Sequence, residues 1–253
     1  MQQNLTSGSV FQNVVRFSLP YLLSYFLQTL YGMADLFIVG QFEPVAATTA
    51  VSIGSQVMHM LTVMLVGLAM GTSVTIAQAV GAGDEKRVAR AVGNTVTLFG
   101  GISALLTVLL LLLVRRITAV MSTPAEAVSG TVRYLTICFL GIPFITAYNV
   151  LSSIFRGMGD SKSPMYFIAC ACVCNIALDY LFIGAMHLGP AGAALGTTFS
   201  QAISVLLALL AISKRGLGLP LHRSDLRPDK AVSGDILKIG FPITCQDGLI
   251  QVA

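Results

Sequence analysis

The chain has 253 residues, of which 55% are hydrophobic and 10% charged, and its mean hydropathy is +0.81. Soluble domains carry about 25% charged residues, so this composition excludes an ordinary soluble domain and indicates a polytopic membrane protein. The formal net charge of +4 is spread over many loops rather than clustered, which argues against a nucleic-acid-binding surface.

The N-terminal stretch MQQNLTSGSVFQNVV is polar at first and then mildly apolar. It lacks the basic segment and the small-residue cleavage site that mark a secretory signal peptide. We therefore expect the first apolar segment to be retained as a membrane span.

Apolar segments follow one another along the chain, and a membrane helix needs about 20 largely apolar residues. Six segments meet this requirement and a seventh begins. Their approximate ranges are 14–39, 47–79, 91–114, 131–155, 165–184 and 192–213, then 235 onward. Pro20 and Pro143 fall within the first and fourth segments, where each removes a backbone hydrogen bond and kinks the helix. The expected fold class is an all-α polytopic membrane protein.

Lysine and arginine residues are distributed unequally between the two sides of the predicted bundle. One side holds only Arg115, Arg116 and Arg133. The other side holds Arg16, Lys86, Arg87, Arg90, Arg156, Lys162, Lys214, Arg215, Arg223, Arg227, Lys230 and Lys238. Because cytoplasmic loops are rich in basic residues, we expect a multi-pass protein of the plasma or inner membrane with a cytoplasmic N terminus.

A short recurrence indicates an internal repeat. Residues 15–20 read VRFSLP and residues 237–242 read LKIGFP, so apolar, basic, small and proline positions match. Six spans return the chain to the cytoplasm, and a second copy would start in the same orientation as the first. Parallel repeats of this kind occur in several secondary transporters, and two complete copies would need roughly 440–450 residues.

Two carboxylates interrupt the first six apolar segments, Asp35 in LQTLYGMADLFIVG and Asp179 in CNIALDYLFIG. An ionisable group inside a span costs about 2.5–3.5 kcal/mol and marks a functional site by default. Asn175 lies one helical turn before Asp179, so the two face the same side. Thr197 follows in GAALGTTFSQ, where small residues allow close helix packing.

Carboxylate, amide and hydroxyl oxygens suit a hard cation such as Na⁺, and a buried carboxyl pair also suits a proton. The structural alternative is that Asp35 and Asp179 only bond to neighbouring helices. Gln28 and Tyr31 recur with Asp35 at helical spacing, which predicts a polar stripe on the first span.

A GxGD motif at Gly157–Asp160 resembles a signature of intramembrane aspartyl proteases, whose chemistry needs two carboxylates. Here the motif lies in the polar loop RGMGDSKSP and recurs in GAGDEKR from Gly81. A structural repeat explains two loop copies better than a unique active site does. The chain also lacks GxSxG, HExxH and Walker motifs, so neither an enzyme nor a cofactor is expected.

Five segments together resemble the multidrug and toxic compound extrusion (MATE) family, over essentially the whole chain. They are YGMADLFIVGQ, AQAVGAGDEKRVARA, IFRGMGDSKSPM, NIALDYLFIG and GPAGAALGTTFSQ. The resemblance implies a V-shaped exporter of two six-helix bundles that works by alternating access. It implies export of cationic or amphipathic drugs and toxic organic compounds, driven by Na⁺ or H⁺. The expected divisions are an N-terminal bundle (1–213), a cytoplasmic linker (214–234) and the first helix of a second bundle (235–253).

The same resemblance implies roles for individual residues. The coupling-cation residues, which would also hold Na⁺, are Asp35, Asn175, Asp179 and Thr197. Pro20 corresponds to a conformational hinge in the first helix. The expected substrate-cavity residues are Gln28, Tyr31, Tyr134, Tyr148 and Asn149.

This sequence departs from the family because nearly all of the second bundle is absent. We expect a fragment of a longer transporter, and the alternatives are one half of a split pair or a homodimeric half-transporter. The missing bundle would then be supplied in cis or in trans. The functional alternatives are a lipid-linked precursor flippase and a non-transporting membrane fragment. A flippase would need Lys or Arg in its cavity to hold an anionic headgroup, and none is expected in the core of the six spans.

Overall fold

In the computed structural model, which describes residues 9–216 and 223–252, the regular elements of those residues are all helical. The helices before the linker are α1 (Val10–Phe42), α2 (Val45–Gly81), α3 (Glu85–Val120), α4 (Val128–Leu140), α5 (Ile142–Gly157), α6 (Lys162–Asp179) and α7 (Pro190–Arg215). A π-helix, η1 (Tyr180–Ala185), extends α6, and a 3₁₀ helix, η2 (Arg223–Leu226), precedes α8 (Lys230–Val252).

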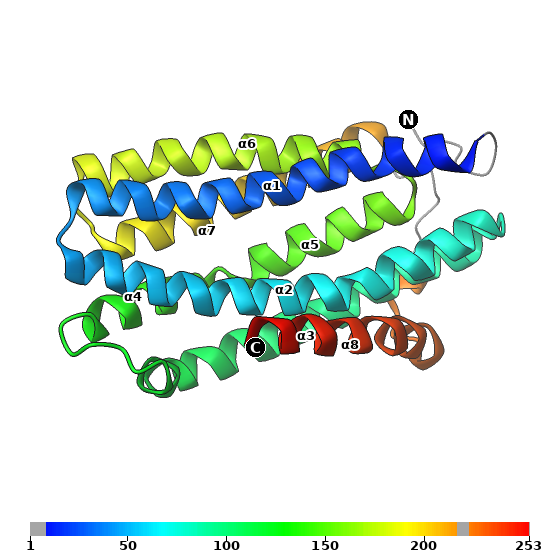
Figure 1. Ribbon diagram of the computed structural model, residues 1–253. Coiled ribbons are helices and arrows are strands. Elements are labelled where there is room, and N and C mark those ends of the chain that lie inside the picture. The colour runs from blue at the N-terminus through cyan, green and yellow to red at the C-terminus, as the bar shows by residue number, and fades with distance from the viewer. Residues whose placement is uncertain (1–8, 217–222, 253) are drawn as a thin grey trace.

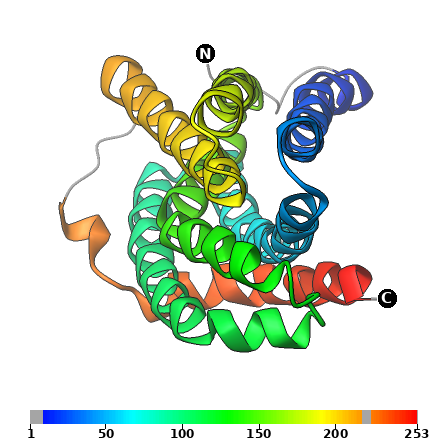
Figure 2. The same ribbon diagram turned by 90° about the vertical axis from the view of Figure 1, so that its left-hand side faces the viewer.

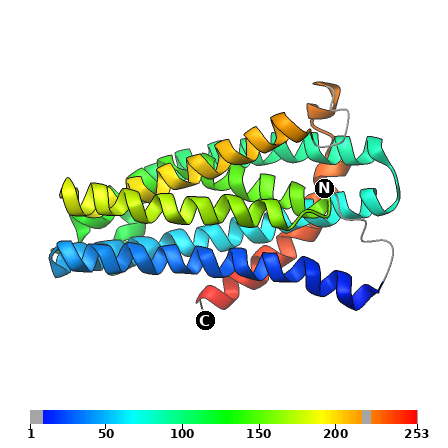
Figure 3. The ribbon, with the colours of Figure 1, turned by 90° about the horizontal axis from the view of Figure 1, so that it is seen from above.

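The helices lie lengthwise beside one another (Figure 1). Viewed from one end, α1, α6 and α7 lie in the upper part of the bundle and α8 lies in the lower part (Figure 2), and α4 and α5 both pack against α2 and α7. The last helix, α8, crosses the others obliquely (Figure 3).

Five helices in the described part of the chain are long and apolar enough to cross a membrane, or six if α4 and α5 form one bent span. Large apolar side chains face outward along them, with Leu105 68% exposed and Leu112 77% exposed on α3. Contiguous apolar surface of this kind suits lipid rather than water. The predicted all-α polytopic membrane fold is therefore confirmed.

The fourth predicted segment is a pair of helices rather than one kinked helix. α4 ends at Leu140, α5 begins at Ile142, and their axes differ by 48°. Pro143 lies in the first turn of α5, where its missing N–H leaves no intrahelical bond unmade. A Cβ added at Gly141, the residue at the break, would lie 2.8 Å from the hydroxyl oxygen of Thr198 on α7. The break is therefore set by glycine packing as well as by proline.

The two GxGD segments form two similar turns, one between α2 and α3 and one between α5 and α6. Each contains a glycine with positive φ, Gly83 or Gly159, a conformation that glycine adopts without strain. The side chains of Asp84 and Asp160 accept backbone N–H groups at the start of the next helix at 2.9 and 3.0 Å. The motif therefore builds helix starts at both places.

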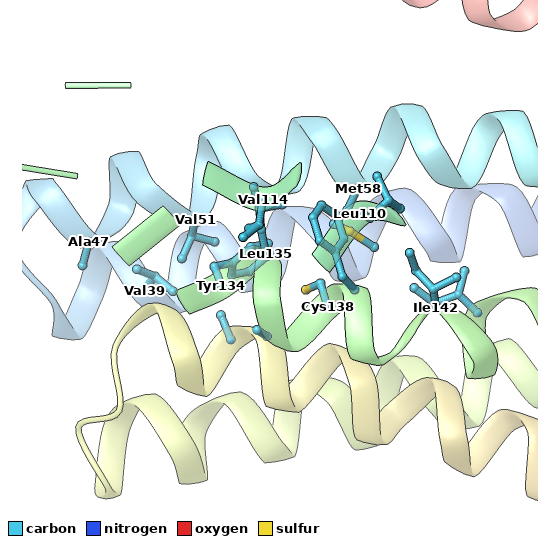
Figure 4. Close-up of a cluster of buried hydrophobic side chains, with 14 of the residues drawn as sticks. Val39, Ala47, Val51, Met58, Leu110, Val114, Tyr134, Leu135, Cys138 and Ile142 are labelled. Atoms are coloured by element: carbon cyan, nitrogen blue, oxygen red, sulfur yellow. The ribbon is translucent and has the colours of Figure 1, made fainter. Parts of the chain in front are cut away.

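The largest buried cluster joins α1, α2, α3, α4, α5, η1 and α7 (Figure 4). Among its fully buried members are Val39, Val51, Leu135 and Phe139. Lipid tails are as apolar as these side chains, so close packing rather than exclusion of water holds the helices together.

Close glycine contacts attach α8 to α2. A Cβ on Gly71 would overlap the carbonyl oxygen of Ile236, and one on Gly240 would overlap the carbonyl oxygen of Leu68. The hydroxyl of Thr244 also donates a hydrogen bond of 3.2 Å to a carbonyl of α2. Small residues thus bring the two backbones into direct contact, as in other membrane helix pairs.

Hydrogen bonds hold the segment before α8 against α3. The Thr97 hydroxyl donates to a carbonyl in η2 at 2.7 Å, and Asn94 Oδ1 accepts the Asp229 N–H at 2.6 Å. α8 begins at Lys230, earlier than its apolar composition predicts, because Asp229 bonds to the first turn. Residues 217–222 of the predicted linker lie outside the described residues.

Candidate functional site

Four polar side chains from three helices meet inside the bundle. Asp35 comes from α1, Asn175 and Asp179 come from α6, and Thr197 comes from α7. Asp35 is 2% exposed, and Asn175 and Asp179 are both 0% exposed. The Thr197 hydroxyl donates a hydrogen bond of 3.0 Å to Asp35 Oδ2. The structure therefore brings together the four residues that the sequence predicts as a cation site.

Most of the polar atoms in this group lack hydrogen-bond partners. Among the described residues, none is within hydrogen-bond geometry of Asp35 Oδ1, of either Asp179 oxygen, or of either polar side-chain atom of Asn175. Asp35 nevertheless lies close enough to Asp179 and Asn175 to interact with both. Unpaired buried polar groups are costly, and oxygen atoms of this kind suit a hard monovalent cation or a shared proton.

A pocket of about 630 Å³ opens beside this group. Asp35 and Thr197 line the pocket, and so do the five predicted cavity residues Gln28, Tyr31, Tyr134, Tyr148 and Asn149. The volume is within the range of about 300–1,000 Å³ that is usual for small-molecule sites. All five predicted substrate-cavity residues therefore line one pocket, and their role in substrate binding stays a prediction.

Several of the tyrosines are fixed by hydrogen bonds. The hydroxyl of Tyr31 accepts from Gln201 Nε2 at 3.3 Å, and that of Tyr134 bonds to Ser55 at 3.0 Å. The Tyr148 hydroxyl donates to the carbonyl of Pro164 at 3.2 Å. The rings can therefore present fixed aromatic faces to the pocket.

The pocket also has lining residues that the sequence did not single out, including Tyr21, Tyr25 and Asp247. Tyr21 and Tyr25 precede Gln28 at helical spacing, so a longer search for the polar stripe on α1 would have found them. Asp247 lies on α8 and reaches the pocket only because α8 packs on α2, a contact that no local pattern indicates.

One basic residue, Arg156, lies in the pocket wall, although the sequence predicts no Lys or Arg in the core of the spans. The predicted fourth span ends at residue 155, whereas α5 continues to Gly157. The Arg156 guanidinium lies 4.7 Å from the centre of the Tyr21 ring, within the range of a cation–π contact. The contact joins α5 to α1 directly after Pro20, which is itself buried inside α1.

The contact between Thr197 and Asp35 gives a testable prediction. Thr197→Val keeps the shape of the side chain but removes the donor, so the free energy of unfolding should fall by roughly 0.6–2 kcal/mol, the range for interhelical hydrogen bonds in membranes. The measurement is thermal unfolding of the purified chain in detergent. Thr198→Val, at the adjacent position, is the control, and equal unfolding temperatures for the two variants would contradict the prediction.

A helical membrane bundle with two buried carboxylates beside a pocket of this size is typical of small-molecule membrane transporters. The chain belongs to the MatE family, because the MatE family model matches residues 20–181.

Known proteins resemble the chain over nearly all of its length. It is 32% identical to "Probable multidrug resistance protein YpnP" of Bacillus subtilis over 96% of the chain and 54% of that relative. It is 30% identical to "Probable multidrug resistance protein NorM" of Thermotoga maritima over 93% of the chain and 51% of that relative. A structure of the outward-facing conformation of a multidrug resistance MATE family transporter matches with a TM-score of 0.88 and 27% identity, over 95% of this chain and 53% of that one. The chain thus spans about half the length of these proteins.

Proposed function

We propose that the chain forms the N-terminal six-helix bundle, with α4 and α5 as one bent span, and the first helix of a second bundle of a cation-coupled antiporter. The antiporter takes up Na⁺ or H⁺ and exports cationic or amphipathic organic compounds by alternating access. The observation that carries the proposal is the group of Asp35, Asn175, Asp179 and Thr197 beside the pocket, in which the two carboxylates and the amide are buried. The remaining wall is supplied by a second bundle, in cis or in trans.

The position of Asp35 suggests how the cation and the cargo are coupled. Asp35 and Thr197 line the pocket, whereas Asn175 and Asp179 lie behind them and are fully buried. A cation that enters from the pocket meets Asp35 first. Its charge then cancels the negative charge that the pocket offers to a cationic cargo, so the bound cation lowers the affinity for that cargo. Such a difference in affinity between states is what coupling requires.

The charges in the pocket wall favour cationic cargo over an anionic lipid headgroup. Asp35 and Asp247 contribute two carboxylates. Arg156 is partly buried and already stacks on Tyr21. Aromatic rings add surfaces that attract organic cations.

Pro20 supports a bending movement of α1 in this mechanism. A proline inside a helix removes one backbone hydrogen bond, and here it lies between the N-terminal end of α1 and Asp35. Occupation of the cation site would bias the bend. The proposal includes a cytoplasmic N terminus, which the excess of Lys and Arg on one side of the bundle supports.

The proposal is tested by binding of two probes of similar size and opposite charge, tetraphenylphosphonium and tetraphenylborate, to the purified chain in nanodiscs, with empty nanodiscs as the reference. We expect tetraphenylphosphonium to bind at least about tenfold more tightly. Addition of Na⁺, or acidification, should displace the bound tetraphenylphosphonium. Asp35→Asn should weaken tetraphenylphosphonium binding. Preference for tetraphenylborate would favour the flippase alternative, and displacement by neither cation would contradict coupling.

A further inference from the structure

Two glycines one helical turn apart on α7 face the end of α6 and have different surroundings. A Cβ on Gly192 would lie 3.1 Å from the Phe182 carbonyl carbon and 3.1 Å from Ile183 Cγ1, both in η1. These are apolar or backbone contacts, so Gly192 serves helix packing, as small residues commonly do in membranes.

Gly196 instead faces the carboxylate of Asp179. A Cβ on Gly196 would overlap Asp179 Oδ1 and would lie 3.5 Å from Asn175 Nδ2. Asp179 is 0% exposed, and neither of its oxygens has a hydrogen-bond partner among the described residues. The carboxylate thus occupies space that any other residue at position 196 would fill with its side chain.

The residue after Gly196 acts on the other carboxylate, because Thr197 donates its hydrogen bond to Asp35. One short stretch of α7 therefore contacts both acidic groups. Asp179 is also the last residue of α6 before the π-helix η1, and π-helical turns are frequent at functional sites.

We propose that Gly196 is a positioning residue of the cation site: the absence of a side chain at 196 lets the Asp179 carboxylate lie beside Asn175 and Asp35, where all three can share one cation. This inference rests on the proposed function, since it assigns Gly196 a role in the same site. It predicts that a single methyl group at position 196 acts on cation binding through Asp179.

The test is infrared difference spectroscopy of the purified chain in lipid, in which the carboxylate band is followed during titration with Na⁺ and, separately, with protons. Gly196→Ala should shift the titration midpoint for the responding cation by at least tenfold, or abolish the response. Two matched controls should keep the parent midpoint. These are Gly192→Ala, which crowds η1 only, and Gly101→Ala, whose added Cβ meets nothing within 4 Å.

A second measurement separates positioning from general damage to the fold. If the new methyl group acts through Asp179, then any loss of thermal stability in Gly196→Ala should be relieved in the Asp179→Ala background, where the carboxylate is absent. Equal losses in both backgrounds, or an unchanged midpoint in Gly196→Ala, would overturn the proposal. If the parent chain responds to neither cation, the proposed function fails. If the parent chain responds and Gly196→Ala has the same titration midpoint as the parent, the proposed function stands and only the positioning role of Gly196 fails.

Discussion

Asp179→Asn is expected to abolish cation-driven efflux of tetraphenylphosphonium by the protein expressed from its complete reading frame, while its amount in the membrane stays the same. The substitution keeps the size of the side chain and removes its charge. A cation about 4 Å from a carboxylate gains about 4 kcal/mol at an effective dielectric constant of about 20. Loss of that attraction corresponds to roughly a thousandfold weaker cation binding.

The measurement is efflux from membrane vesicles with a Na⁺ gradient and a proton gradient imposed in turn, which also identifies the coupling cation. Asp84→Asn is the matched control, because Asp84 is exposed and its side chain accepts a backbone N–H at the start of α3. Unchanged efflux by Asp179→Asn, at equal protein amounts, would contradict the proposed site.

The second large effect is expected at the contact between α2 and α8. Gly71→Ala places a methyl group where the carbonyl oxygen of Ile236 lies, and the backbone N of Gly240 is 3.0 Å away. Backbone atoms cannot move aside as a flexible side chain can. Overpacking of this kind typically costs about 1–3 kcal/mol, so α8 should separate from α2 more readily than in the parent chain.

The measurement for Gly71→Ala is the rate of tryptic cleavage after Lys230 and Lys238, in the first part of α8. Faster cleavage is expected, together with a lower unfolding temperature. Gly100→Ala is the control, because its added Cβ meets nothing within 4 Å. Parent-like cleavage in Gly71→Ala would mean that the close backbone contact does not hold α8 in place.

The helices were largely predictable because apolar length alone identifies a membrane span. The sixth segment, predicted at 192–213, is α7 (Pro190–Arg215). The third segment, predicted at 91–114, is the longer α3 (Glu85–Val120), because hydropathy detects the part in lipid and misses polar turns that continue the helix. The π-helix after Asp179 was not predictable, since it packs against Gly192 on another helix.

The grouping of the four polar residues was predictable for a physical reason: carboxylates in apolar spans are costly and therefore rare. Asp35 and Asp179 are conspicuous for this reason, Asn175 lies one helical turn before Asp179, and Thr197 lies in the small-residue stretch of the sixth span. The resemblance to known transporters then implied that the four share one cation site. Asp247 was missed because its place in the pocket depends on where α8 crosses α2. Such tertiary contacts leave no periodic signal in one sequence.

Infrared difference spectroscopy of the unmodified chain, exchanged between Na⁺ and choline and between acidic and alkaline buffer, tests the central claim most directly. A cation held by Asp35 and Asp179 must change a carboxyl or carboxylate band in one of these exchanges. The account predicts that Asp35→Asn and Asp179→Asn each remove that change, whereas Asp84→Asn keeps it. Difference spectra that are the same in the parent and in both buried variants would contradict the claim.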